Sequence, residues 1–443
     1  MTKRAEDAIQ IFEAAVAAVQ PARLLRENLL VTESSIVIDD FSIPLSSLQS
    51  IYVIGAGKAS AAMALEAEQI LENRITDGLV VTKYGHSLPA ERIRIVEAAH
   101  PVPDKNSIQA VQETVQLLNK VTENDLILCL LSGGASALWC DVPPGATLQE
   151  VQVTFDLLLK SGANIHEMNT VRKHLSAIKG GQLVRRCNGA WVFSLIISDV
   201  PGDNLEVIAS GPTVADTSTF ADAYVVLTKY QLLDKLPQAI LQHIEKGRRN
   251  GLAETPKPGD ALFRKTVNKI IGTNRMALQA AEKKAGVLGY HPVVNPKMVT
   301  GDAETVAKDM VDLALSYKGE LPACLLQGGE TTVQVSGTGK GGRNQHVALS
   351  ALFGLSKMSY KNNSPHITIL SAGTDGTDGP TDAAGAVVDQ TMLEEAELKK
   401  RCIEAYLQNH DAYHFFQQTG GLLFTGPTQT NVMDIMITLV TNQ

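Results

Sequence analysis

The residues that point most directly to chemistry are those from Ser336 to Arg343, which read SGTGKGGR. Glycines next to two cations predict a loop whose backbone N–H groups close around an anion such as phosphate. Alternation from Thr331 to Val335 predicts a strand before the loop, and helical spacing from Asn344 predicts a helix after it. The alternative is a plain turn. The expected phosphate-binding residues are Gly337, Gly339, Lys340, Gly341, Gly342 and Asn344, with Arg343 as a catalytic cation.

A second cation, Lys58, lies in a turn that follows an apolar run and precedes a helical pattern. We expect Lys58 to be catalytic, with its ammonium beside an anion at the helix N-terminus and Gly55 and Gly57 binding the same group. The dinucleotide fingerprint is incomplete, because Ser60 replaces its third glycine and Asp77 precedes the next strand rather than ending it. The turn therefore favours phosphate over a nicotinamide cofactor.

A third turn, LSGGAS from Leu131, joins an apolar strand to a helix and consists almost entirely of small residues. Its open backbone and hydroxyls predict substrate or phosphate binding, although close packing of helix on strand is the alternative. The nucleophile elbow GxSxG is absent, which argues against a serine hydrolase. The expected binding residues are Ser132, Gly133, Gly134 and Ser136.

Acidic residues follow two further apolar strands. Asp199 follows an apolar strand at the edge where open α/β sheets bind ligands. We expect it to act as a catalytic base or to bind a metal; the alternative is that it only caps a turn. Asp375 and Asp378 lie in a Gly/Thr loop and are expected to hold Mg²⁺, although Asp-Gly pairs also make plain turns. Carboxylates combined with a cationic glycine loop favour phosphoryl transfer.

The composition is that of an α/β enzyme with two domains: 443 residues, 44% apolar and 5% aromatic. A net charge of −8 argues against a nucleic-acid-binding surface. Five scattered cysteines predict buried thiols in a reducing cytoplasm, and the longest apolar stretch is too short to span a membrane. Strands alternating with helices predict a mostly parallel sheet, and the expected domains are residues 1–246 and 261–443 with a linker at 247–260.

Motifs throughout the chain resemble those of the glycerate 2-kinases with a C-terminal MOFRL domain. They include GAGKAS, HPVPD, LSGGASAL, KHLSAIKGGQL, SDVPGD, SGPTVAD, GGETTV, GTGKGGRNQ and SAGTDGTDGPTDAAGA. The resemblance implies a Rossmann-like N-terminal domain with a parallel sheet flanked by helices, a C-terminal α/β MOFRL domain, and an active site in the cleft between them. It also implies phosphorylation of D-glycerate at the 2-hydroxyl with ATP and Mg²⁺, and it brings Lys58 and Arg343 together.

Two other functions are compatible with parts of the pattern. An NAD(P)-dependent hydroxypyruvate reductase is the enzymatic alternative, and a sugar-phosphate or nucleotide-binding regulator is the non-enzymatic one. The chain has no Walker A motif, because Gly341 follows Lys340, and no protein-kinase motif. The partners expected are small molecules, without nucleic acid or membrane. The sequence leaves open whether the protein is a monomer or a homodimer, and whether the product is 2- or 3-phosphoglycerate.

Overall fold

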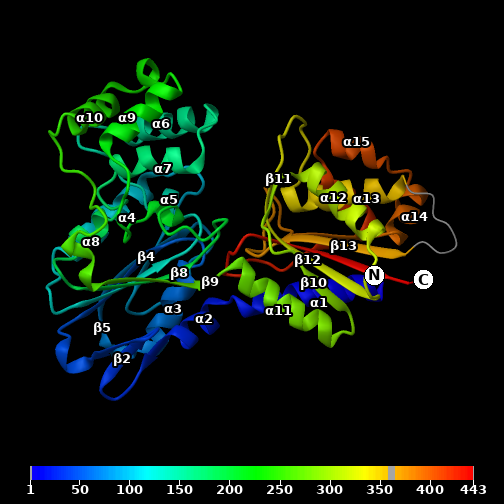
Figure 1. The fold of residues 1–443 in the computed structure, drawn as a ribbon, viewed down its shortest axis with the longest axis horizontal. Helices are drawn as coiled ribbons and strands as arrows, with labels where there is room; N and C mark the ends of the chain where they lie inside the picture. The colour runs from blue at the N-terminus through cyan, green and yellow to red at the C-terminus, as the bar shows by residue number, and fades with distance from the viewer. Residues whose placement is uncertain (1, 358–364, 443) are drawn as a thin grey trace. The chain divides into compact units, whose positions relative to one another are not determined.

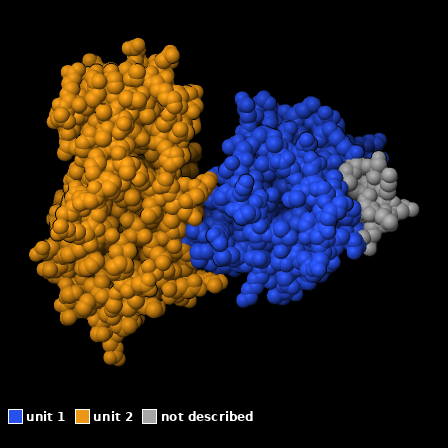
Figure 2. Space-filling view, in the orientation of Figure 1, with its two compact units in different colours: residues 1–20, 272–443 blue, residues 21–271 orange. Residues whose placement is uncertain are grey.

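The computed structural model describes residues 2–357 and 365–442. The chain divides into two compact units (Figure 2). Unit 1 comprises residues 1–20 and 272–443, and unit 2 comprises residues 21–271. Both contain a sheet covered by helices, which confirms the expected two-domain α/β class.

Unit 2 is built on a six-stranded sheet (Figure 1). Its strands are β4 (Ile51–Ala56), β5 (Ile75–Lys83), β6 (Arg94–Ala98), β7 (Leu126–Leu131), β8 (Trp191–Ile197) and β9 (Thr266–Gly272). The pairs β4–β5, β4–β7, β5–β6 and β7–β8 are parallel. The order β6-β5-β4-β7-β8-β9 is that of a Rossmann sheet, in which the first strand is flanked by the second and the fourth. Ligands of such sheets bind where the order reverses, which here is between the carboxyl ends of β4 and β7.

Helices cover this sheet because its central strands are apolar throughout and must be buried on both faces. Side chains of α4, α5 and α8 join those of β4, β5, β7 and β8 in one core, and α6, α7, α9 and α10 form a second, helical core. The helices are α2 (Pro21–Asn28), α3 (Ser60–Leu71), α4 (Lys105–Leu118), α5 (Ala135–Leu138), α6 (Leu148–Lys160), α7 (Ile165–His174), α8 (Gln182–Arg185), α9 (Phe220–Lys229) and α10 (Gln238–Arg248). A small antiparallel sheet comprises β1 (Leu29–Val31), β2 (Ser35–Ile38) and β3 (Phe41–Pro44).

Unit 1 holds a mixed sheet rather than a mostly parallel one. Strands β10 and β11 run parallel to β12, whereas β16 lies antiparallel between β12 and β13. The last strand of the chain therefore fills the centre of this sheet. The strands are β10 (His291–Val294), β11 (Val299–Asp302), β12 (Ala323–Thr332), β13 (His366–Gly373), β14 (Gly385–Asp389), β15 (Leu422–Leu423) and β16 (Asp434–Thr441).

Helices cover both faces of the unit 1 sheet, with α1 and α11 on one side and α12 to α16 on the other (Figure 1). They are α1 (Lys3–Ala18), α11 (Asn274–Val287), α12 (Ala303–Ser316), α13 (Arg343–Ser356), α14 (Thr391–Leu398), α15 (Ile403–Gln408) and α16 (Ala412–Thr419). The expected strand at residues 331–335 ends earlier, at Thr332, whereas the expected helix from Asn344 is α13.

The observed units differ from the expected domains at both ends of the first domain. Helix α1 belongs to unit 1, where Asp7 accepts a hydrogen bond from Tyr290 at 3.0 Å. The expected linker at 247–260 lies within unit 2, because the backbone of Asp216 donates to Pro256 and Thr255 donates to the Asp216 carboxylate. Lack of periodicity marked this segment correctly as irregular, but its hydrogen bonds are tertiary and leave no local pattern.

Four cysteines are buried free thiols as expected, whereas Cys402 is exposed. Within the described residues, no single helix combines the length and the apolar composition needed to cross a membrane; α1 and α2 meet that test only as a bent pair.

The position of α1 can be tested with Phe12, which is fully buried. We expect Phe12→Ala to lower the free energy of unfolding of unit 1 by about 3–5 kcal/mol, because the change opens a cavity. Hydrogen exchange should then accelerate in α11 and β16, not in β4 and β7. The control is Glu13→Ala, which alters an exposed position of the same helix. Faster exchange in β4 and β7 alone would contradict the assignment of α1 to unit 1.

Candidate active site

The turn that carries Lys58 is joined by hydrogen bonds to the turn after β7. Ser132 Oγ accepts from the backbone N–H of Ala59 at 3.0 Å and lies 3.0 Å from Ser60 Oγ. The backbone N–H of Lys58 donates to the carbonyl of Gly133 at 2.9 Å. The backbone donors of the turn before α3 are thus used within the protein, which fixes the backbone that carries the Lys58 side chain.

Lys58 lies beside His100 and Gly134. A side chain at Gly134, whose φ is +86°, would meet His100 Cδ2 at 3.0 Å and Lys58 Cγ at 3.4 Å. Glycine is therefore needed here both for its backbone conformation and for space. The motif HPVPD contained His100, but only the sheet brings the end of β6 to the Lys58 turn.

Ser136 belongs to a buried chain of polar side chains. Its Oγ lies 2.9 Å from Ser210 Oγ, which donates to Asn169 Oδ1 at 3.0 Å. Ala209, Ser210 and Gly211 all have positive φ, at 53°, 60° and 62°. Consecutive non-glycine residues in this region are strained, and such strain persists only where the surroundings impose it. Nothing in the spacing of Ser210 or Asn169 predicted this chain.

Asp199 lies two residues after β8, partly exposed, at the same carboxyl edge as Lys58 and Ser132. The turn here uses Ser198 as its cap, because Ser198 Oγ accepts from the N–H of Val200 at 3.3 Å. The sheet thus brings Lys58, Ser132, Ser136 and Asp199 to one edge of unit 2, where parallel sheets bind ligands.

In unit 1, the glycine-rich loop packs against the segment that follows α15. Gly339 N–H donates to the Asn409 carbonyl at 2.9 Å, and Lys340 N–H donates to Asp411 Oδ1 at 2.8 Å. A side chain at Gly337 would meet the Asn409 carbonyl at 2.3 Å. The Lys340 ammonium lies 4.5 Å from the centre of the Tyr413 ring. These glycines permit close packing, and two of the expected phosphate donors are already hydrogen-bonded.

Asp378 caps the N-terminus of α13. Its carboxylate accepts from the backbone N–H groups of Asn344 and Gln345 at 3.0 and 2.8 Å, and from both side-chain amides. The Asn344 amide also accepts from Ser371 Oγ at 2.7 Å. The negative charge expected at this helix N-terminus is therefore supplied by the protein itself.

This capping role leaves Asp378 poorly suited to bind metal. It is 2% exposed, and both of its oxygens accept hydrogen bonds. Asp375 is partly exposed and accepts from Thr377. No three His, Cys, Asp or Glu side chains in residues 2–357 and 365–442 are arranged to hold a metal ion. Asp378 therefore does not fit the predicted Mg²⁺ site, whereas for Asp375, a partly exposed carboxylate, the metal role stays a prediction.

Arg343, the first residue of α13, is held by two carboxylates. Its Nε and Nη2 donate to Asp434 at 2.6 and 2.9 Å, and its Nη1 lies 2.7 Å from Glu330. Burial acts against the charged guanidinium, but pairing with Asp434 outweighs it and raises the pKa of Arg343. Glu330 ends the GGE motif of β12, whereas Asp434 lies 91 residues from Arg343 and no motif pointed to it.

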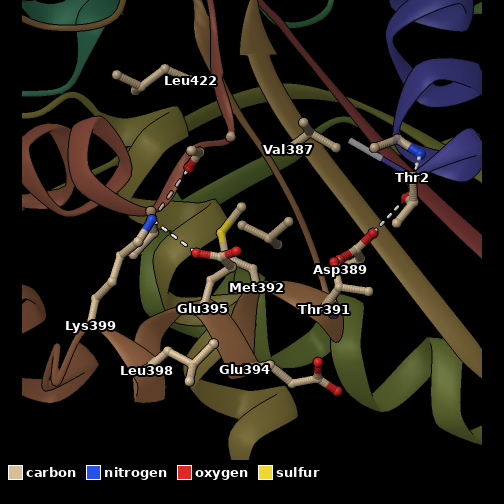
Figure 3. Close-up of a pocket in the computed structure, with 15 residues that line it drawn as sticks. Thr2, Val387, Asp389, Thr391, Met392, Glu394, Glu395, Leu398, Lys399 and Leu422 are labelled. Carbon is tan, nitrogen blue, oxygen red and sulfur yellow. Dashed lines mark hydrogen bonds and ion pairs between the residues drawn. The ribbon is translucent and has the colours of Figure 1, made fainter.

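A pocket of about 490 Å³ lies elsewhere in unit 1 (Figure 3). Thr2 Oγ1 donates to Asp389 at 2.6 Å there, and Lys399 pairs with Glu395 at 2.9 Å. Of the described residues that line it, none is a predicted site residue.

The capping carboxylate predicts a pH dependence of stability. Burial raises the pKa of Asp378 from 3.8 to about 6 despite the hydrogen bonds donated by Gln345 and Asn344. Its proton thus stabilises the folded state fully below pH 3.8, and this contribution is lost as the pH rises through about 6. Relative to Asp378→Asn, the wild-type free energy of unfolding should fall by at most about 1.4 kcal/mol per pH unit across that window. Urea denaturation of both proteins measures it; a difference independent of pH would contradict the assignment.

Comparison with known proteins covers nearly the whole chain. Residues 7–245 match a domain family of unknown function (DUF4147), and residues 323–434 match the MOFRL family. A glycerate 2-kinase of Pyrococcus horikoshii is 40% identical over 99% of this chain and 98% of its own. A D-glycerate 2-kinase of Thermotoga maritima is 39% identical over 98% and 97%.

A putative hydroxypyruvate reductase of Agrobacterium vitis is 39% identical over 97% of this chain and 93% of its own. The solved structure of a glycerate kinase from Thermotoga maritima aligns with a TM-score of 0.83 and 37% identity, covering 99% of each chain. Both family models match, and the relatives are about 40% identical over nearly the whole chain. The chain therefore belongs to the glycerate kinase family that carries a MOFRL domain.

Proposed function

We propose that this protein transfers the terminal phosphoryl group of ATP to D-glycerate at the 2-hydroxyl, giving 2-phospho-D-glycerate. The observation that carries the proposal is that each unit holds a cation in a glycine turn that leads into a helix: Lys58 before α3, with its backbone bonded to Gly133, and Arg343 at the start of α13. Cations placed in this way can stabilise the charge of a phosphoryl group. The names of the relatives from Pyrococcus and Thermotoga support glycerate as acceptor and the 2-position as its site.

Each predicted residue has a proposed part. Lys58 and Arg343 stabilise negative charge on the phosphoryl oxygens as the bond to ADP breaks. Asp199 accepts the proton of the attacking hydroxyl, because it is a partly exposed carboxylate at the ligand-binding edge of its sheet. Ser132 and Gly133 fix the Lys58 turn, which keeps the lysine in place. Magnesium is proposed as the counterion of the nucleotide, with Asp375 as the carboxylate to hold it, because both oxygens of the buried Asp378 already accept hydrogen bonds.

The glycine-rich loop is proposed to act as a rigid support for α13. Its backbone donors at Gly339 and Lys340 are bonded to the segment after α15, and Lys340 lies over the Tyr413 ring. Such a loop holds Arg343 in a defined position with little further loss of entropy on binding.

Hydroxypyruvate reduction is the alternative that one relative's name raises. Strand order alone does not exclude it, because unit 2 has the order of a Rossmann sheet. However, two donors at the turn into α3, where a pyrophosphate would bind, are used within the protein: the Ala59 N–H by Ser132 and the Ser60 N–H by Gly57. The next strand, β5, ends in Lys83 instead of the acid that binds a ribose, and Asp77 near its start is paired with Lys120 at 3.1 Å.

The activity is tested with purified protein in two parallel assays, D-glycerate with ATP and hydroxypyruvate with NADH or NADPH. We expect turnover only in the first. Phosphorus NMR of the product identifies the acceptor oxygen: a phosphate on the secondary carbon couples to one proton and gives a doublet, whereas one on the primary carbon gives a triplet. A triplet would contradict the 2-position, and turnover only with hydroxypyruvate would contradict the kinase.

The two cations are tested with Lys58→Ala and Arg343→Lys. Each should lower kcat by about 10²–10³, the usual cost of losing one contact to developing charge. Lysine at 343 keeps a charge for Asp434 but cannot reproduce the two-pronged geometry of arginine. The control is Lys120→Ala, which removes an exposed lysine of unit 2. Melting curves check the fold, and near-wild-type kcat in either variant would remove that residue from the site.

A further inference from the structure

Asp434 is a carboxylate whose backbone and side chain are both held firmly in unit 1. It is fully buried, and as the first residue of β16 it pairs with Gly329 of β12 and Gly373 of β13. Its carbonyl accepts from Asn274 Nδ2 at 3.0 Å, and the same nitrogen donates to the Val432 carbonyl at 2.8 Å. Two strands and the start of α11 therefore fix the backbone from which this side chain projects.

Two glycines leave room for the arrangement. A Cβ at Gly373 would lie 3.4 Å from Asp434 Oδ1, and one at Gly328 would lie 1.7 Å from Asn274 Oδ1. A side chain at Gly328 would thus displace Asn274, and one at Gly373 would crowd the carboxylate. The first glycine of the GGE motif and the glycine of SAGTD are explained by this packing, without a ligand.

The two acids that hold Arg343 differ in exposure and in geometry. Asp434 receives Nε and Nη2 in a two-pronged pair and has no exposed side chain. Glu330 lies 2.7 Å from Nη1, and its side chain is 42% exposed. One edge of the guanidinium is therefore fixed inside unit 1, while the other is held by a group that water and solutes reach.

We propose that Asp434 is a positioning residue: it fixes the guanidinium of Arg343 so that the Nη1 edge meets a phosphoryl group, which displaces Glu330. This inference rests on the proposed function, because it takes Arg343 to act on phosphate. A buried ion pair adds little net stability compared with apolar packing, whereas its two-pronged geometry fixes orientation. Misplacing such a group by about 1 Å can cost about 10²-fold in rate.

The first test is a double-mutant cycle in the D-glycerate and ATP assay. Asp434→Asn keeps the size of the side chain but removes the charge, and should lower kcat by about 10- to 100-fold. In the Arg343→Ala background the same change should have little further effect, because its target is gone. The control is Glu304→Gln. Glu304 is an exposed acid that pairs at 3.2 Å with His346, which lies on α13 like Arg343. This variant should retain wild-type kcat.

A second measurement does not depend on the stability of Asp434→Asn alone. Methylguanidinium added to Arg343→Ala should restore part of the activity, because Asp434 binds the cation where the side chain was. The double variant Arg343→Ala/Asp434→Asn should lose this rescue while melting no lower than Arg343→Ala, since it no longer buries an unpaired charge.

Three outcomes separate the inference from the function on which it rests. Equal rescue with and without Asp434 would overturn the positioning role. So would an equal loss of kcat from Asp434→Asn in the wild-type and Arg343→Ala backgrounds, because a purely structural effect is independent of Arg343. If the wild-type protein does not phosphorylate D-glycerate, or Arg343→Ala keeps full activity, the proposed function itself fails at that point.

Discussion

N–H groups in the turn that leads into α3 and at the start of α13 are hydrogen-bonded within the protein, and this constraint decides how each turn can act. At α3 the acceptor is the hydroxyl of Ser132, and at α13 it is the carboxylate of Asp378. A helix N-terminus attracts anions through free donors and its dipole, so an internal acceptor removes much of that attraction. Binding of phosphate then depends on cationic side chains, which makes the exact positions of Lys58 and Arg343 important.

The two cations are positioned by different means. Lys58 depends on contact between neighbouring loops, because its backbone N–H is bonded to Gly133 after the adjacent strand. Arg343 depends on charge, because a buried carboxylate on β16 holds two of its nitrogens. The lysine is thus positioned through its backbone, whereas the arginine is fixed at the guanidinium. Substitutions around Lys58 should therefore act through the backbone, and those around Arg343 through electrostatics.

Much of the candidate site follows from local sequence. Strand–glycine–helix patterns located the turns at Lys58, Ser132 and Arg343, because apolar runs, glycine and helical spacing are local signals. The fold class and the parallel sheet of unit 2 were predicted correctly on the same grounds, and the family was predicted correctly from the resemblance of the motifs. Family motifs also selected Gly328 and Gly373, and both allow close packing around Asn274 and Asp434.

Only the tertiary structure decided which groups meet across the sequence. Asp434 and Asn274 reach the Arg343 site because β16 enters the centre of a mixed sheet, and α1 joins unit 1 because its apolar face packs on α11. The sequence identified Asp378 as a carboxylate in a loop, and the fold made it a helix cap instead of a metal ligand. The physical reason is common to all three: strand pairing, burial and capping join residues far apart in the chain, and spacing reports only on neighbours.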